Sequence, residues 1–112
     1  LRAFLRDVAG LNLKILITEL DVIDQKLPPE IDRRDRSVAS VYEDYLSIVL
    51  DEPAVIAVLT WGLSDRSTWH SKFNPREDKA PVRPLPLDAQ GKRKLAWNAI
   101  ARTFDRSAKR KV

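Results

Sequence analysis

The sequence predicts an α/β protein built on a parallel sheet, and three observations carry that prediction. Two short, continuously apolar runs, residues 13–20 and 54–61, have the length of strands buried on both faces. Segments with helical spacing of apolar residues alternate with these runs, in the order helix, strand, helix, strand, helix. Such alternation is typical of parallel strands joined by right-handed crossovers. Because two strands cannot bury both faces of a sheet, we expect the chain to be a segment of a larger α/β protein.

The amino-terminal part of the chain predicts a helix followed by a strand. Apolar residues recur at helical spacing through residues 1–9, and Gly10 then ends the pattern. Residues 13–20 predict a strand, in which side chains alternate between the two faces. One face of this strand and its exit is expected to carry Ile15, Ile17, Glu19 and Asp21.

The middle of the chain predicts a loop, a helix and the second strand. Residues 22–36 contain adjacent prolines and many charges, which is typical of a loop. Ser37 suits the N-cap of a helix that runs to about Leu50, and residues 54–61 then form the second strand. The apolar stripe of the helix is expected to consist of Val38, Val41, Tyr42, Tyr45, Leu46 and Val49.

The carboxyl-terminal part predicts a long loop, a last helix and a tail. Residues 62–90 hold Pro75, Pro81, Pro84 and Pro86 and are expected to form a long loop, and a loop of that length in a compact domain is typically functional or disordered. Asp88 or Gln90 suits the start of the last helix. Residues 105–112 are mostly basic, and we expect them to form a disordered tail after a domain that spans residues 1–104.

Composition narrows the classes of protein to consider. The chain has 112 residues, enough for one modest domain, and its lack of cysteine excludes disulfides, thiol catalysis and cysteine-based zinc sites. It contains no methionine and begins at Leu1, so we expect a processed product or a piece of something longer. No stretch approaches the roughly 18 apolar residues of a membrane span, and no leader pattern is present, although a leader would lie upstream of any fragment. We therefore expect no membrane partner.

The net charge of +4 is unevenly distributed along the chain. Residues 1–89 hold 12 Lys and Arg against 15 Asp and Glu, whereas residues 90–112 hold 8 Lys and Arg against a single acid. Such a basic cluster can contact phosphates, which makes nucleic-acid binding one hypothesis. The cluster lacks interleaved aromatic residues for base stacking, which disfavours a nucleic-acid partner. Its members are Lys92, Arg93, Lys94, Arg102, Arg106, Lys109, Arg110 and Lys111.

Acidic and aromatic side chains follow the two predicted strands where the chemistry of a parallel barrel lies, at the carboxyl ends. Glu19 and Asp21 end the first strand, Trp61 ends the second, and Trp69 follows closely. Carboxylates at a strand exit are costly unless they are paired or used. From spacing alone, the acids suit an ion-paired strand end and the tryptophans suit core packing. The same residues are also the parts of a sugar-cleaving site.

Four motifs, in order, resemble the carboxyl-terminal part of glycoside hydrolase family 10. These are endo-1,4-beta-xylanases with a TIM (β/α)8 barrel, and the resemblance covers nearly all of the chain. It implies that residues 1–104 supply strands seven and eight with their flanking helices. The motifs are Ile17-Thr18-Glu19-Leu20-Asp21-Val22, Thr60-Trp61-Gly62-Leu63-Ser64-Asp65-Arg66-Ser67-Thr68-Trp69, Arg83-Pro84-Leu85-Pro86-Leu87-Asp88 and Lys94-Leu95-Ala96-Trp97-Asn98-Ala99-Ile100.

The resemblance implies a retaining endo-1,4-beta-xylanase, which hydrolyses internal beta-1,4-xylosidic bonds in xylan without a metal or other cofactor. Glu19 matches the catalytic nucleophile, and Asp21 matches an acid that helps hold a histidine beside it. Trp61 and Trp69 match aromatic residues that wall the sugar-binding subsites. The implied partners are xylan or xylo-oligosaccharides and the remainder of the parent barrel, and the implied location of the parent is extracellular or periplasmic.

Two family features have no counterpart in this sequence. The acid/base glutamate of the family follows an asparagine, and no Asn-Glu pair occurs here. The histidine beside the nucleophile is also missing, because His70 follows Trp69 and does not match it. We therefore expect an isolated fragment of this kind to be inactive. The alternative is a non-catalytic carbohydrate- or nucleic-acid-binding module.

The remaining histidine and tryptophan favour structural interpretations. A single histidine on a loop is more often solvated than catalytic, so His70 is expected to lie in solvent. Trp97 lies in the apolar stripe of the last helix and is expected to pack on the outside of the barrel.

Overall fold

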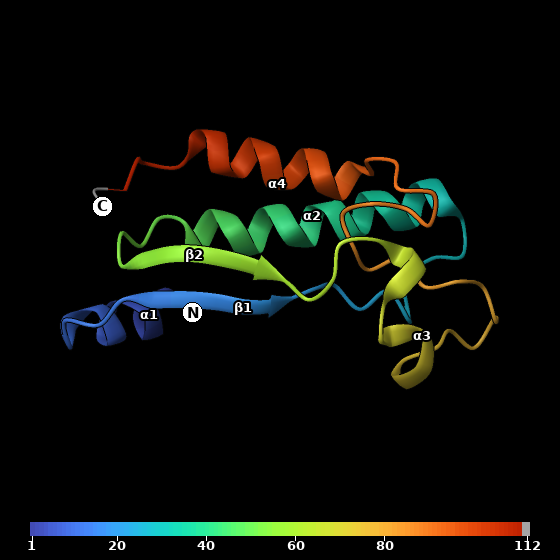
Figure 1. The fold of residues 1–112 in the computed structure, drawn as a ribbon, viewed down its shortest axis with the longest axis horizontal. Coiled ribbons are helices and arrows are strands. Elements are labelled where there is room, and N and C mark those ends of the chain that lie inside the picture. Colours follow the sequence, from blue (N-terminus) through green and yellow to red (C-terminus); the bar gives the residue numbers. More distant parts are fainter. Residues whose placement is uncertain (111–112) are drawn as a thin grey trace.

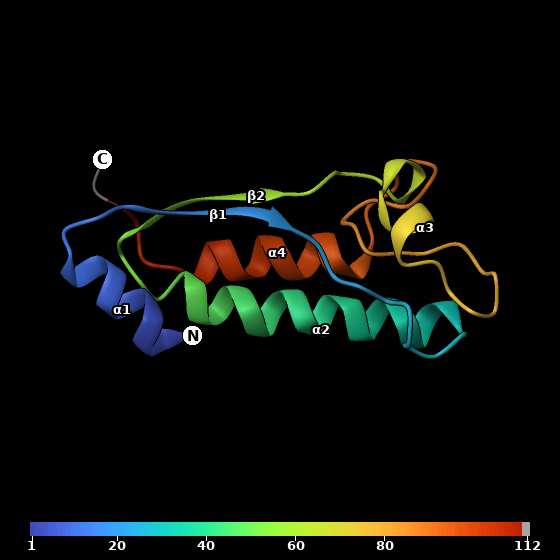
Figure 2. The same ribbon diagram turned by 90° about the horizontal axis from the view of Figure 1, so that it is seen from below.

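The structure is a computed structural model that describes residues 1–110 as a two-stranded sheet with helices along one face (Figures 1 and 2). Strands β1 (Ile15–Leu20) and β2 (Val55–Thr60) are parallel, with Ile17 opposite Val58. The helices are α1 (Arg2–Gly10), α2 (Ile31–Val49), the short α3 (His70–Phe73) and α4 (Leu95–Arg106), and a 3-10 turn spans Asp65–Ser67. The predicted order of helices and strands and the parallel pairing are confirmed, and the long loop contains a short helix.

Helices α2 and α4 lie side by side against the same face of the sheet, as Figure 2 shows. One core cluster joins Val22 to Val38 and Tyr42 of α2 and to Ala96 of α4. The Tyr42 hydroxyl donates a buried hydrogen bond of 2.6 Å to the Pro84 carbonyl, which ties the long loop to α2. The long loop that carries the later motifs is therefore attached to the core.

The alternation of β1 changes at Glu19. Ile15 and Ile17 pack into the helix layer, as a regular strand requires. The ladder is irregular between Ile17 and Leu20, and after it Leu20 packs into the core cluster that contains Val22. The expectation that Glu19 and Asp21 share a face with Ile15 and Ile17 is therefore wrong, because the backbone irregularity turns Glu19 away from the helices.

Helix α2 begins at Ile31, six positions before the predicted N-cap Ser37. Its charged first turns are helical because their side chains are paired with distant loop residues. Arg34 is buried beside Asp24, with Nε 3.4 Å from Oδ2, and the Asp35 carboxylate lies 2.7 Å from the guanidinium of Arg83. A charged segment that the sequence assigns to a loop is thus buried by ion pairing.

Helix α4 begins at Leu95, later than either predicted start. The Asp88 carboxylate does not start a helix but closes a turn, since Oδ1 accepts the backbone N–H groups of Gln90 and Lys92. Trp97 is half-buried on α4, beneath the guanidinium of Arg93, which lies 3.8 Å from the ring centroid.

The predicted tail is ordered in its first residues. Residues 105 and 106 complete α4, so their predicted disorder is wrong. Arg110 donates hydrogen bonds to the carbonyls of Leu50, Glu52 and Val55, which lie at the end of α2 and the start of β2. Residues 111 and 112 of the predicted tail lie outside the described residues. Within residues 1–110, no helix is both long and apolar enough to cross a membrane.

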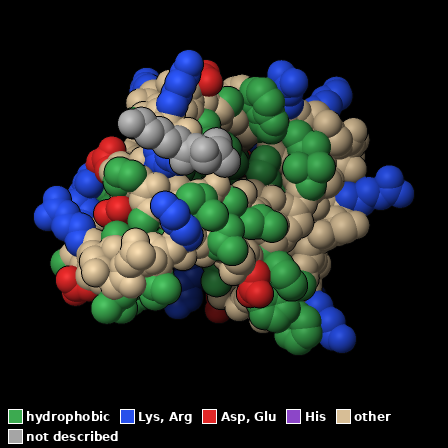
Figure 3. Space-filling model, turned by 60° about the vertical axis from the view of Figure 1, so that its left-hand side comes forward, with side chains coloured by type: hydrophobic (Ala, Val, Ile, Leu, Met, Phe, Trp, Pro, Cys, Tyr) green, Lys and Arg blue, Asp and Glu red, His purple; other side chains and the backbone are tan. Residues whose placement is uncertain are grey.

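The face of the sheet opposite the helices is bare. Leu16 of β1 is 57% exposed and Leu59 of β2 is 52% exposed, although both are large apolar side chains in strands. Apolar side chains also gather on the surface at the end of the molecule that carries α1 and the starts of the strands, as Figure 3 shows. An exposed apolar face of this kind is typical of a surface that another surface covers.

We predict that the isolated 112-residue chain binds a dye for exposed apolar surface and unfolds in urea without a sharp transition. The reason is that the bare face leaves strand side chains in water, and two strands do not sustain an independent sheet. The measurements are dye fluorescence and far-ultraviolet circular dichroism along a urea titration.

The double variant Leu16→Thr/Leu59→Thr serves as the control, because it makes the bare face more polar and introduces β-branched side chains, which suit strands. It should lower the dye fluorescence. A monomeric, cooperative unfolding transition of the unmodified chain, with little dye bound, would contradict the prediction.

Candidate functional site

The ends of the two strands meet at one edge of the sheet. The backbone N–H of Trp61 donates to the Leu20 carbonyl at 2.9 Å, so the residues that follow both strands begin at the same level. This register brings Glu19 and Asp21 to the edge from which Trp61 departs. The carboxyl edge of a parallel sheet is where α/β proteins place their binding groups.

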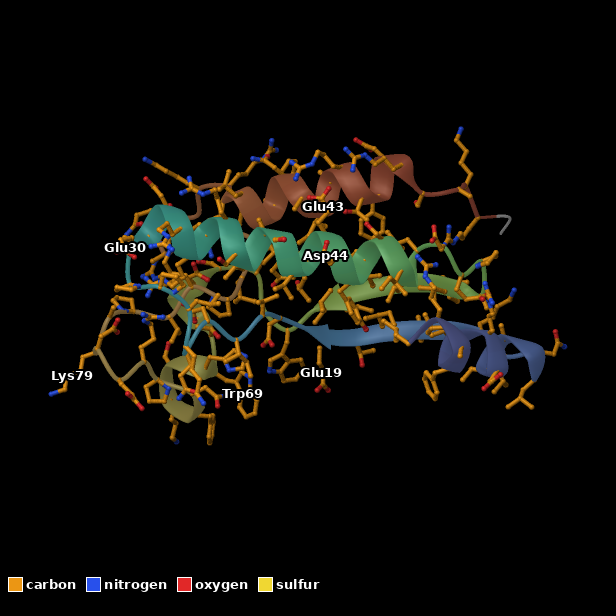
Figure 4. All side chains as sticks on the ribbon, turned by 180° about the vertical axis from the view of Figure 1, so that it is seen from behind. Glu19, Glu30, Glu43, Asp44, Trp69 and Lys79 are labelled. Carbon is orange, nitrogen blue, oxygen red and sulfur yellow. The ribbon has the colours of Figure 1, made fainter. Side chains whose placement is uncertain are left out.

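Glu19 has an unusual backbone conformation. Its φ is +62°, in the left-handed region that residues other than glycine seldom occupy. Its side chain is exposed and points away from α2, as Figure 4 shows. No ion pair within residues 1–110 involves Glu19, in contrast to the ion-paired strand end that spacing alone suggests. A strained, unpaired carboxylate at a strand exit indicates a functional constraint.

Asp21 contacts the histidine that the sequence assigned to solvent. The Nε2 atom of His70 lies 2.8 Å from Asp21 Oδ2, and His70 is only 3% exposed. The expectation of a solvated His70 is wrong, because the loop folds back and α3 begins with His70 against the exit of β1. The contact is short but off the line of a hydrogen bond, since Nε2 has no hydrogen-bond partner within residues 1–110.

The Nδ1 atom, on the other side of the His70 ring, also has a partner. Nδ1 lies 2.9 Å from the Asn74 side-chain nitrogen, and the backbone N–H of His70 donates to Thr68 Oγ1 at 3.2 Å. Donation from Asn74 to Nδ1 leaves the proton on Nε2, which faces the carboxylate of Asp21. The ring therefore has an acid on one side and an amide on the other.

The two tryptophans are half-exposed at the same end of the molecule. Trp61 is 48% and Trp69 is 49% exposed, so neither is a filler of the described core. The Trp69 ring packs on Phe73, with centroids 4.7 Å apart, and lies 5.6 Å from the His70 ring. Sequence reasoning missed Phe73, whose position one helical turn after Trp69 is the signal that links them.

Gly62, directly after Trp61, is required by the course of the chain. Its φ of +105° is rare for any residue with a side chain, and a Cβ there would lie 2.9 Å from Leu85 Cδ1. The glycine allows the backbone to turn sharply away from β2 while Leu85 packs against it. Trp61 is thereby held at the sheet edge.

A buried ion pair fixes the loop that carries Trp69. Asp65 Oδ2 lies 2.9 Å from Lys94 Nζ, and both side chains are almost fully buried. Asp65 Oδ1 accepts the N–H of Leu85, while Lys94 donates to the carbonyls of Arg83 and Leu85. Burial raises the pKa of Asp65 and lowers the pKa of Lys94, although each partner favours the charged form of the other. The pair therefore holds the motif of residues 60–69, which contains Asp65, against the motif of residues 94–100, which begins with Lys94.

A second polar cluster ties the loop after α3 to the segment that follows β1. Arg76 donates to the carbonyls of Asp24 and Leu27 and lies 2.7 Å from Asp78. The hydrogen bond from Arg76 lowers the pKa of Asp78 to about 2. This cluster and the Asp21–His70 contact attach the loop to β1 and its exit at two points.

The basic residues proposed as phosphate contacts are largely engaged elsewhere. Lys94 is buried, Arg102 and Arg106 pair with Glu43 at 3.0 and 3.1 Å, and Arg110 bonds to backbone carbonyls. Lys111 lies outside the described residues. Within the part of the chain that the structure describes, no three His, Asp or Glu side chains are grouped so as to hold a metal ion.

The sequence is similar to one family of known proteins. The sequence profile of the family described as Glycosyl hydrolase family 10 matches residues 1–103. Endo-1,4-beta-xylanase A of Caldicellulosiruptor saccharolyticus is 34% identical over 106 residues, which cover 84% of this chain and 29% of that protein. The chain thus spans under a third of the length of this relative.

Solved structures of xylanases are also similar to this chain. The native xylanase 10B of Thermotoga maritima has a TM-score of 0.79 and 30% identity over 93% of this chain and 31% of its own. Xylanase 10B of Thermotoga petrophila RKU-1, crystallised with xylobiose, has a TM-score of 0.78 and 30% identity over 93% of this chain and 30% of its own. Each similarity is confined to about a third of the larger protein.

We predict that Lys94→Met lowers the stability of a folded barrel that contains this chain by about 3–5 kcal/mol. The substitution leaves the Asp65 carboxylate buried without its partner and removes the donor to two carbonyls. The host is a completed barrel, in which this chain replaces the matched segment of the Thermotoga maritima xylanase 10B. The measurement is a urea titration followed by circular dichroism.

Lys92→Met is the matched control, because Lys92 is exposed and lies two positions away. It should change the free energy of unfolding by less than about 0.5 kcal/mol. Equal losses in the two variants would show that the buried ion pair is unimportant.

Proposed function

The chain belongs to glycosyl hydrolase family 10, and on that basis we propose that it is the carboxyl-terminal segment of a retaining endo-1,4-beta-xylanase barrel. In this proposal β1 and β2 are strands seven and eight of the TIM barrel, and residues 1–104 belong to the catalytic domain. The observation that carries the proposal is the exposed carboxylate of Glu19, which has no ion pair within residues 1–110 and lies at a strand exit, at the edge from which Trp61 departs.

Glu19 is proposed as the nucleophile. Retaining enzymes use two carboxyl groups about 5–5.5 Å apart. The Glu19 carboxylate attacks the anomeric carbon and forms a glycosyl ester, while the second carboxylic acid protonates the departing glycosidic oxygen. That second group then takes a proton from water, which attacks the same carbon and releases Glu19 and the sugar hemiacetal. The sequence lacks an Asn-Glu pair, so we assign the acid/base residue to the remainder of the barrel.

The surroundings of Glu19 suit this role. Its left-handed backbone turns the side chain to the bare face and away from the apolar helix layer, so the carboxylate is accessible to a substrate. A strand exit is a rigid mount, which favours attack at a distance of about 3–3.5 Å. Asp21, two residues further on, is proposed to support the nucleophile and is itself held by His70.

Trp61 and Trp69 are proposed to bind the xylan chain. Half-exposed indole faces suit the C–H faces of pyranose rings, while nearby polar groups satisfy the hydroxyls. The structure of the Thermotoga petrophila relative in complex with xylobiose supports this ligand class. The parent protein would then meet its polymeric substrate outside the cell or in the periplasm.

The remainder of the barrel is the proposed partner of the bare face. It would cover the apolar side chains on that face and supply the acid/base carboxyl. The isolated chain, which holds a single member of the catalytic pair, is proposed to lack xylanase activity.

A non-catalytic carbohydrate-binding fragment is the second candidate. Both tryptophans are half-exposed, and stacking on a sugar does not need an acid/base residue. Titration of the 112-residue chain with xylo-oligosaccharides, followed by tryptophan fluorescence, tests it. Saturable quenching by the chain, together with a completed barrel that binds xylan but does not hydrolyse it, would support the second candidate. Release of xylobiose from xylan by the purified chain would contradict its proposed inactivity.

We predict that Glu19→Gln lowers the kcat of the completed barrel by roughly 10³- to 10⁶-fold while xylan binding persists. The amide keeps the shape of the side chain but cannot form the glycosyl ester. The measurements are release of reducing sugar and binding to insoluble xylan.

Glu77→Gln is the control, because Glu77 is an exposed loop acid distant in sequence from the strand exits. Turnover near the unmodified level in Glu19→Gln would remove Glu19 from its role.

We predict that Trp61→Ala and Trp69→Ala each raise the KM of the completed barrel for xylo-oligosaccharides by about 10-fold, since each removes one stacking surface. The measurement is initial-rate kinetics on an oligosaccharide of defined length. Trp97→Ala, at a half-buried position on α4 beneath Arg93, should leave KM within about twofold. An equal rise in all three variants would indicate a general loss of folding.

A further inference from the structure

His70 is buried next to Asp21 in the proposed site and takes no direct part in the proposed reaction. We propose that His70 is a positioning residue that holds the Asp21 carboxylate and the Trp69 wall in one fixed arrangement next to Glu19. This inference rests on the proposed function, because it concerns how the same site is held.

His70 and the Asp21 carboxylate are in close electrostatic contact. His70 Nε2 lies 2.8 Å from Asp21 Oδ2, off the line of a hydrogen bond, and because Asn74 engages Nδ1, the N–H of the ring is on the Nε2 side next to the carboxylate. The side chains are only 4% and 13% exposed, so little water competes for either atom. The imidazole therefore restrains the Asp21 carboxylate through its Oδ2 atom.

His70 is also linked to the Trp69 wall. His70 is the first residue of α3 and directly follows Trp69, whose ring lies 5.6 Å from the imidazole. Asn74, one turn later, holds the other ring nitrogen at 2.9 Å. The contact to Asp21 thus ties both ends of α3, and the Trp69 ring with them, to the end of β1.

The position of Glu19 depends on its neighbours in the sequence. Glu19 has no ion pair within residues 1–110, so nothing described holds its side chain directly. Asp21, two residues away and just past the end of β1, is the charged side chain nearest to Glu19 in the sequence that contacts a partner. Release of Asp21 and Trp69 would let the nucleophile and the sugar shift relative to each other, and a displacement of about 1 Å costs about 100-fold in rate.

The test uses the completed barrel with three substitutions. His70→Leu removes the donor and keeps an apolar side chain in the buried space, whereas His70→Gln keeps an N–H group near the position of Nε2. Ser71→Ala is the matched control, because Ser71 lies on α3 and is exposed. We expect His70→Leu to lower kcat by about 10- to 100-fold, His70→Gln to recover at least a third of the lost rate, and Ser71→Ala to match the unmodified barrel.

A double-mutant cycle separates positioning from a general contribution to folding. Asp21→Asn is measured alone and together with His70→Leu, and the losses in kcat should be far from additive because each substitution breaks the same contact. If His70→Leu does not fold, the same cycle is run with His70→Gln, in which Asp21→Asn should again cost less than in the unmodified barrel.

Failure of this inference is distinguishable from failure of the proposed function. If Glu19→Gln abolishes turnover while His70→Leu retains kcat within twofold, or the cycle is additive, the positioning role is overturned and the nucleophile stands. Equal losses in His70→Leu and His70→Gln, each with the same drop in melting temperature, also overturn it. If Glu19→Gln itself turns over xylan normally, the proposed function fails first.

Discussion

The left-handed backbone of Glu19 is the constraint on which the candidate site depends. Ile15 and Ile17 face the helices, and strict alternation would send Glu19 into the same apolar layer. A carboxylate buried there without a partner would be strongly unfavourable. A single residue at φ +62° reverses the pattern, so that Leu20 rejoins the core while Glu19 turns to the bare face. The strain is local, and the packing of Leu20 and Val22 holds it in place.

Polar contacts, rather than a large apolar core, hold the segment between β2 and α4. Apolar clusters serve the helices and the sheet, whereas the loop is fixed by Asp65 with Lys94, Arg83 with Asp35, and the carbonyl contacts of Arg76. Buried ion pairs add little net stability but are costly to break on one side. They specify one loop path, and that path sets where Trp69 and His70 lie. The proposed site is therefore built on electrostatic contacts whose partners are far apart in the sequence.

The strands, their order and their parallel pairing were predictable because continuous apolar runs carry that information locally. The start of α2 was not, because Arg34 and Asp35 look like loop residues until Asp24 and Arg83 are placed beside them. The burial of His70 was missed for the same reason, since its partner Asp21 is 49 positions earlier. The acids and tryptophans at the strand ends could be identified by motif, whereas the backbone turn at Glu19 left no signal in the alternation of side chains. Long-range charge pairing and a single irregular φ are the two features that local patterns do not encode.

Completion of the fold and completion of the site are one requirement in the proposed barrel. Leu16 is half-exposed on the face opposite the helices, and Glu19 points to that side as well. A surface that covers this face must leave room beside Glu19 for a sugar and bring a second carboxyl to about 5–5.5 Å from it. Apolar contact along the strands provides the association free energy, and the strand exits provide the chemistry. In this proposal the remainder of the barrel accounts both for the bare sheet and for the lack of an ion pair to Glu19 within residues 1–110, and a segment that folds without it would hold one member of the proposed catalytic pair.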